Sequence, residues 1–204
     1  MSPHVSRRNT LGFLASLAAS TLTGCATLRR DEIGKGCLEG HVLVEWNRED
    51  KFIYRIVKDK KPLGFKPSFM NEFIVPQEMY TTGGSIPRIL WGIPGLSPWG
   101  LGPAYIIHDW LFYVHRCNIS APEHERKITF RQSQLILAEV GLELINKRLI
   151  DHDLLDEIVY AVGTRYAENI WKRPGDHEEC KSPPASLVPF DRSTATIVAD
   201  FVIP

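Results

Sequence analysis

The most regular hydrophobic pattern in the chain lies between residues 103 and 116. Apolar side chains recur there at intervals of three and four residues, at Ala104, Ile107, Leu111 and Val114. This spacing is typical of a helix with one buried face. Pro103 follows Gly102, and a proline at the first helical position is a common start signal. The pattern therefore predicts a largely buried helix that begins at about residue 103.

Two earlier segments have the composition of β-strands. His41–Trp46 and Phe52–Val57 are rich in β-branched and aromatic residues, and the polar residues 47–50 between them predict a hairpin loop. A third, short strand is expected at Glu72–Val75, and one more in the C-terminal part at Thr196–Val202. The first two segments therefore predict an antiparallel pair.

Two further helices are expected after the first. Ser120 and Glu123 have the spacing of a capping box, which predicts the start of a long helix. Asp151 or Asp153 begins another helix, which ends near Pro174. Strands followed by helices predict an α+β fold: a small antiparallel β-sheet, made of a hairpin plus a short strand, and then a bundle of three main helices.

The first residues are typical of an export signal rather than of a folded domain. The basic segment Ser6–Arg8 precedes an apolar run, Leu11–Leu22, which is too short to span a bilayer. Ser6–Leu11 resembles a twin-arginine export motif, and the general secretory route stays open. Leu22–Cys25 resembles the lipobox of bacterial lipoproteins, which implies that Cys25 is lipidated. The alternative is a buried cysteine in an ordinary signal-like segment.

The chain is therefore expected to have four parts. Residues 1–24 are a signal peptide that ends in the lipobox, 25–40 a spacer after the lipidated cysteine, 41–175 the folded domain and 176–204 an extended tail. Acyl chains on Cys25 anchor such a protein without a membrane helix. Ala26 follows this cysteine where an aspartate would be expected for the inner membrane. We therefore expect a cell-envelope lipoprotein on the outer membrane that faces the periplasm.

The charge balance gives no indication of nucleic acid binding. The chain has 24 basic and 24 acidic residues, and removal of the signal peptide takes away Arg7 and Arg8 but no acid. The mature chain is therefore slightly acidic, unlike most proteins that bind a phosphate backbone. The expected partners are the membrane, through the acyl chains, and an unknown envelope protein or glycan.

Three cysteines follow Cys25 in the sequence, namely Cys37, Cys117 and Cys180. An exported protein can form disulfides, and three cysteines allow one bridge with one thiol left over. Their spacing does not match a zinc site. We expect a Cys37–Cys180 bridge that joins the two irregular ends, with Cys117 as a small buried residue.

Part of the chain resembles an uncharacterised protein family. Three segments match the DUF1353 family, which occurs in phages, prophages and bacterial genomes, in both order and spacing: Ile74–Pro76, Gly84–Arg88 and His108–Phe112. The resemblance covers roughly residues 42–172. It implies a domain of this family but no defined activity.

Two positions depart from the pattern of that family. Thr82 stands where the family has an aspartate in the loop, and Ser133–Gln134 stands where it has an acidic position on the following helix. Two of the three acidic positions that would make a site are therefore neutral in this chain.

His108 and Asp109 place adjacent acid–base side chains inside the apolar helix. A buried carboxylate is costly unless it is paired or binds a cation, so the pair indicates a site. One hypothesis is a hydrolase of a lipid or cell-wall ester or amide. His108 would be the general base, and Asp109 would bind Ca²⁺ or another divalent cation. Gly83 and Gly84 would then supply loop carbonyls, while Gln134 would orient the histidine.

The other hypothesis is that the pair holds the fold together. Asp109 would accept hydrogen bonds from the amides of Gly83, Gly84 and Ser85 or pair with Arg88, so that the loop packs on the helix. His108 would donate to a backbone carbonyl.

The neutral residues Thr82 and Gln134 favour the second hypothesis, because they remove charge that a cation or an imidazolium would need. We therefore predict a non-enzymatic binding or structural role without a metal or cofactor, with the hydrolase as the alternative.

Overall fold

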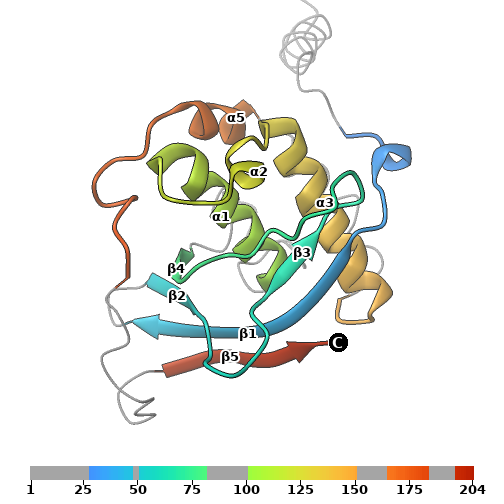
Figure 1. Cartoon of the computed structure of the whole chain (residues 1–204), viewed down its shortest axis with the longest axis horizontal. Helices are drawn as coiled ribbons and strands as arrows, with labels where there is room; N and C mark the ends of the chain where they lie inside the picture. The colour runs from blue at the N-terminus through green and yellow to red at the C-terminus, as the bar shows by residue number, and fades with distance from the viewer. Residues whose placement is uncertain (1–27, 48–50, 82–100, 151–164, 184–195) are drawn as a thin grey trace, which may run out of the picture.

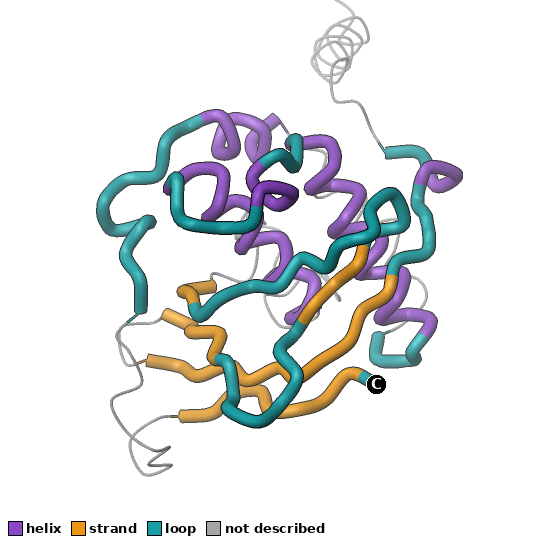
Figure 2. The backbone as a smooth tube through the Cα atoms, in the orientation of Figure 1, coloured by secondary structure: helices purple, strands orange, loops and turns teal. Residues whose placement is uncertain are grey.

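The computed structural model describes residues 28–47, 51–81, 101–150, 165–183 and 196–204. A curved antiparallel sheet forms one layer, and the helices pack together on one side of it (Figure 1). The tube in Figure 2 shows strands and helices in separate parts of the domain. The predicted α+β fold, in which a sheet is followed by helices, is confirmed.

The central strand of the sheet is β1 (Cys37–Asn47). It pairs antiparallel with β2 (Lys51–Arg55), β3 (Gly64–Lys66) and β5 (Thr196–Ile203). The short strand β4 (Met79–Thr81) pairs with β2 and completes the order β3-β1-β2-β4. The first and last strands of the described chain therefore lie side by side.

The predicted hairpin is present as β1 and β2, whereas the strand predicted at Glu72–Val75 is wrong. Ile74 makes an isolated bridge with Phe65, and the next strand is β4 instead. Pro76 directly follows the predicted strand, and a proline has no N–H to continue a ladder of hydrogen bonds.

The domain begins earlier than the sequence indicates. β1 starts at Cys37, inside the predicted spacer 25–40, and Leu28 already belongs to the buried core. Gly40 has a φ of 110°, a conformation that L side chains rarely adopt. A Cβ at this position would lie 2.1 Å from the carbonyl oxygen of Pro62, so only glycine fits there.

Two long helices, α1 (Gly102–Cys117) and α3 (Phe130–Asn146), form most of the helical layer. Shorter segments are the 3-10 turn η1 (Arg30–Glu32), α2 (Glu123–Arg126) and α5 (Arg165–Lys172). The helix expected after Asp151 or Asp153 falls largely on residues outside the described ranges, and its last part corresponds to α5.

The long helix α3 starts later than predicted. The Ser120–Glu123 segment leads only into the single turn of α2, and α3 has its own capping box, formed by Thr129 and Gln132. The Thr129 hydroxyl accepts a hydrogen bond from the amide of Gln132, and the Gln132 side chain accepts one from the amide of Thr129. Ser120 and Thr129, nine residues apart, both have the sequence pattern of a helix N-cap, which explains why the start of α3 was predicted too early.

The core lies between the sheet and α1, which buries most of its residues. The largest fully buried side chains include Trp110, Tyr54, Tyr105 and Phe65. The apolar periodicity predicted for α1 is confirmed by the burial of Ala104, Ile107, Leu111 and Val114. In the described ranges, no helix is long and apolar enough to cross a membrane.

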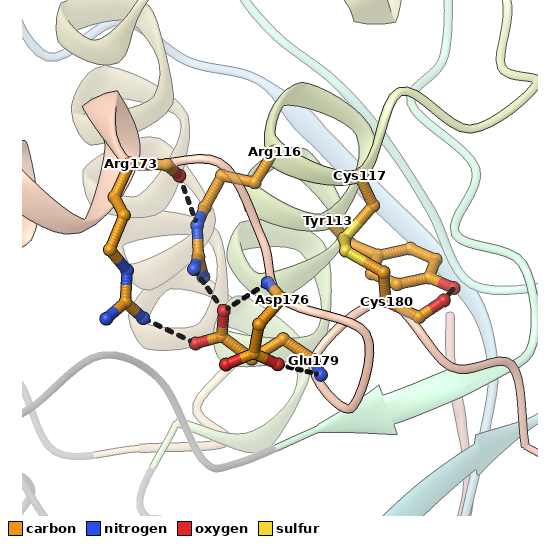
Figure 3. The surroundings of a disulfide bond; sticks show 7 residues. All are labelled: Tyr113, Arg116, Cys117, Arg173, Asp176, Glu179 and Cys180. Carbon is orange, nitrogen blue, oxygen red and sulfur yellow. Dashed lines mark hydrogen bonds and ion pairs between the residues drawn. A yellow bond between two sulfur atoms is a disulfide. The ribbon is translucent and has the colours of Figure 1, made fainter.

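The disulfide expected between Cys37 and Cys180 is wrong, because Cys180 bonds to Cys117 at the end of α1 (Figure 3). The two Cα atoms are 5.4 Å apart. The Tyr113 hydroxyl donates to the Cys180 carbonyl at 3.0 Å, which fixes this part of the tail beside the helix. Cys37 is an exposed free thiol.

Charged residues hold the same part of the tail in place (Figure 3). The Arg116 guanidinium donates to the carbonyl of Arg173 at 3.0 Å and to the carboxylate of Glu179 at 2.5 Å. Arg173 pairs with the other oxygen of Glu179 at 2.7 Å. The first residues of the predicted extended tail are therefore tied to α1, and its last residues form β5.

Candidate functional site on helix α1

His108 lies in the middle of α1 and is almost completely buried, with an exposed fraction of 3%. Its ring centroid is 4.6 Å from that of Phe112, one turn further along the helix. Neither ring nitrogen has a hydrogen-bond partner in the part of the chain that the structure describes. Burial lowers the pKa of His108 to about 4, so the imidazole is neutral at pH 7.

Asp109 is half-buried and faces the end of β4. Its carboxylate accepts a hydrogen bond of 2.8 Å from the hydroxyl of Thr81, the last residue of that strand. This contact ties the sheet to α1 at the point where the chain enters residues 82–100. Asp109 thus contacts a residue that the sequence did not indicate, and the expected partners Gly83–Arg88 lie outside the described residues.

Tyr105 lies one turn before His108 and Asp109 on the same face of α1. Its hydroxyl is buried and has no hydrogen-bond partner among the described residues. Burial raises the pKa of Tyr105, and the nearby charge of Asp109 raises it further, so the phenol keeps its proton. This face of α1 therefore presents a neutral phenol and a neutral imidazole beside one carboxylate.

Gln134, the residue expected to orient His108, is buried on α3. It makes no hydrogen bond to His108, because neither nitrogen of that ring is engaged by a described residue. The neighbouring Ser133 donates to the carbonyl of Phe130 at 2.7 Å and is fully buried. Positions 133 and 134 are both buried, so a neutral side chain avoids the free-energy cost of burying a carboxylate there.

The remaining predicted site residues are not brought together in the described structure. Gly83, Gly84, Ser85 and Arg88 lie outside the described residues, and so does Cys25. Within the described ranges, no three His, Cys, Asp or Glu side chains are grouped so that they could hold a metal ion.

Sequence reasoning missed a buried carboxylate that joins three parts of the domain. Glu125 on α2 accepts hydrogen bonds from the amide of Val75 at 3.0 Å and from the indole of Trp110 at 2.8 Å. Burial raises the pKa of Glu125, and both hydrogen bonds oppose this rise. Trp110 is the residue in the sequence that points to such an acceptor, because the N–H of a buried indole needs a hydrogen-bond partner.

Glu139 on α3 is a second buried carboxylate of this kind. It accepts hydrogen bonds from both the amide and the hydroxyl of Ser68, at 2.9 and 2.5 Å. The loop that follows β3 is therefore fixed to α3 at Ser68. Glutamate is normally exposed on helices, so the sequence gives no signal for this contact.

A third unpredicted contact joins the neighbouring strands β1 and β5. The Nε2 atom of buried His41 on β1 is 2.7 Å from the carboxylate of Asp200 on β5, and Lys60 approaches the same nitrogen at 3.1 Å. The register places Asp200 opposite Leu43, close to His41 along β1. This contact fixes β5 in its register.

Comparison of the chain with models of known protein families, with curated proteins and with solved structures gives no match. The resemblance to the DUF1353 family therefore remains a proposal. The geometry of the α1 site consists of a shielded imidazole that is neutral at pH 7 and a carboxylate engaged with the sheet.

Proposed function

We propose that the chain is a lipid-anchored protein of the bacterial cell envelope, with a DUF1353-like domain in a non-enzymatic binding or structural role. The non-enzymatic role rests on the burial of His108, which has an exposed fraction of 3%. A general base must reach the proton that it abstracts, and this imidazole is shielded from solvent. The contact of Asp109 with Thr81 gives the neighbouring carboxylate a structural role.

The location rests on two independent features. The lipobox-like segment Leu22–Cys25 supports export and lipidation, and Ala26 supports the outer membrane. The Cys117–Cys180 disulfide also supports export, because such bonds persist in oxidising compartments such as the periplasm and are rare in the cytosol.

Metabolic labelling with palmitate tests the anchor. The wild-type chain should incorporate label and float with the membrane fraction, whereas Cys25→Ser should do neither. Cys37→Ser is the matched control, because it removes another thiol without touching the lipobox. Equal labelling of the Cys25→Ser and wild-type chains would overturn the anchor.

The alternative function is a His-based or metal-assisted hydrolase of a lipid or cell-wall ester or amide. The observation that favours it is the unpaired state of both His108 nitrogens among the described residues. A buried polar group without a partner requires an explanation, and a catalytic role is one of those that apply. Ca²⁺ or another divalent cation at Asp109 belongs to this alternative alone.

Complementation of a deletion strain separates the two functions. In a binding or structural role, the phenotype of His108→Ala should follow its loss of stability. It should therefore match Leu137→Ala, a buried residue on α3 that is chosen as a stability-matched control. A His108→Ala chain that keeps its stability and its level in the cell but fails to complement would favour the hydrolase.

A further inference from the structure

The connection between the proposed lipid anchor and the folded domain is very short. Leu28 is 5% exposed and packs in the main hydrophobic core, only three residues after Cys25. Three residues span at most about 11 Å even when fully extended. An acyl group on Cys25 therefore holds the backbone at Leu28 within about 11 Å of the lipid, so one particular side of the domain must face the membrane.

That side, which we call the tether face, consists of the exposed residues of Arg29–Lys35 together with Phe69. Arg29, Arg30 and Lys35 are exposed cations on it, alongside Asp31 and Glu32. Arg29 and Asp31 form an exposed ion pair at 2.9 Å, which a headgroup phosphate would have to replace. The tether face is fixed to the domain on both sides of η1. The buried Leu28 precedes η1, and Glu32, its last residue, forms an ion pair with Arg131 of α3.

Phe69 belongs to this face because its neighbour Ser68 touches the same segment. A Cβ on Gly34 would lie 2.0 Å from the Ser68 hydroxyl, and Glu139 holds Ser68 through two hydrogen bonds. In Figure 1 the N-terminal segment passes the loop after β3 near α3. Phe69 is 40% exposed there, a large apolar side chain on a loop that α3 fixes in place.

We infer that the tether face lies flat on the phospholipid surface that carries the anchor, with Phe69 at the interface and Arg29 and Arg30 against headgroup phosphates. This inference rests on the proposed lipidation of Cys25. Aromatic side chains favour the membrane interface, and cations near an anionic leaflet are attracted to it. The partner is therefore an anionic phospholipid surface rather than a second protein.

Energy transfer to a labelled lipid headgroup tests the orientation on the full lipidated chain. The chain is reconstituted in vesicles of phosphatidylethanolamine and phosphatidylglycerol that contain a headgroup acceptor dye. The donor is attached either to the native Cys37 thiol or to Val198→Cys in a Cys37→Ser background. Both positions are exposed, and Val198 lies beside the far end of β1, roughly 25 Å away at the usual rise per residue.

Transfer from Cys37 should exceed transfer from Val198→Cys by severalfold. Equal transfer, or more from Val198→Cys, would overturn the inference. Flotation in the same preparation reports on the anchor separately. Vesicle-bound chains with equal transfer overturn the orientation alone, whereas chains that carry no lipid and do not float overturn the anchor and the orientation together.

Charge and ring variants then test the chemistry of the contact. Arg29→Glu with Arg30→Glu should reduce transfer from Cys37 at least twofold without releasing the chain, and Phe69→Ala should act in the same direction. The matched control is Lys58→Glu with Lys172→Glu, two exposed lysines outside the tether face, which should leave the transfer unchanged. Unfolding midpoints confirm that each variant is folded. An equal effect of the two charge reversals, or none from either, would overturn headgroup recognition by this face.

Discussion

The indole nitrogen of Trp110 on α1 donates a hydrogen bond of 2.8 Å to the carboxylate of Glu125 on α2. The other oxygen of the same carboxylate accepts the amide of Val75, in the segment between β3 and β4. One buried acid therefore connects the consecutive helices α1 and α2 to a loop that lies 50 residues earlier in the chain. Each oxygen of the Glu125 carboxylate accepts a hydrogen bond, which offsets part of the cost of burying this side chain.

Glu125→Ala should lower the free energy of unfolding by about 3 kcal/mol, because it leaves two buried donors without an acceptor at about 1–3 kcal/mol each. Urea denaturation measures the change. Glu123→Ala is the control: its side chain lies on the same helix but is 69% exposed, so the loss should stay within about 0.5 kcal/mol. Equal losses in the two variants would contradict the central role of Glu125.

Thr81 and Asp109 should show a direct energetic coupling. Hydrogen bonds to charged groups contribute about 1.5–3 kcal/mol, and this one joins β4 to α1. A double-mutant cycle with Thr81→Val and Asp109→Ala, followed by chemical denaturation, should give a coupling energy of at least 1 kcal/mol. Additive losses would mean that the contact does not stabilise the fold.

Protonation of His108 should destabilise the domain in mild acid. The pKa is 6.5 in the unfolded chain and about 4 in the folded one, so the unfolded state takes up the proton first. The stability contributed by the neutral imidazole is complete above pH 6.5, decreases as the pH falls, and is lost below about pH 4. The loss from this group should be about 2 kcal/mol between pH 7 and pH 5.

Urea denaturation of His108→Leu at both pH values isolates this effect from that of other groups. The variant should lose about 2 kcal/mol less than the wild type between pH 7 and pH 5. His177→Asn, at a side chain that is 93% exposed, should behave like the wild type. If His108→Leu shows the same loss as the wild type, the buried histidine is not the cause.

The disulfide should contribute substantially to stability. Cys117 and Cys180 are 63 residues apart, and closing a loop of this length stabilises a fold by about 4 kcal/mol when the effect is treated as loss of chain entropy. Cys117→Ser should lose about this amount under oxidising conditions. Cys37→Ser should be neutral, because Cys37 is an exposed free thiol. Alkylation of Cys117 in the folded, unreduced chain would contradict the bridge.

The elements that the sequence predicted well are those defined by local patterns. α1 follows from its apolar periodicity and Pro103, and the β1–β2 hairpin follows from two β-branched segments around a polar loop. The start of α3 was misplaced because Ser120 and Thr129 both satisfy the same capping pattern. Local patterns alone do not decide between two caps that lie so close together.

The contacts that the sequence did not reveal depend on distant segments. The sequence favoured Cys37 as the partner of Cys180 because both lie in irregular ends, but the folded chain brings Cys117 to a Cα separation of 5.4 Å from Cys180 instead. The burial of Glu125 and Glu139 is hidden for the same reason, since each finds its donors in another element. For the candidate site, the sequence indicated His108 and Asp109 but neither Tyr105 nor Thr81.

The pairing of β5 with β1 determines when the sheet can be completed. Among the described strands, β1 is synthesised before all others and β5 after them, and the two share seven paired positions along β1. Contacts between such distant segments slow folding, because the intervening chain must first be closed into a loop. Until β5 is made, β1 has one open edge that can pair with another chain. An unfinished or C-terminally clipped chain should therefore be prone to aggregation, even when every other element is intact.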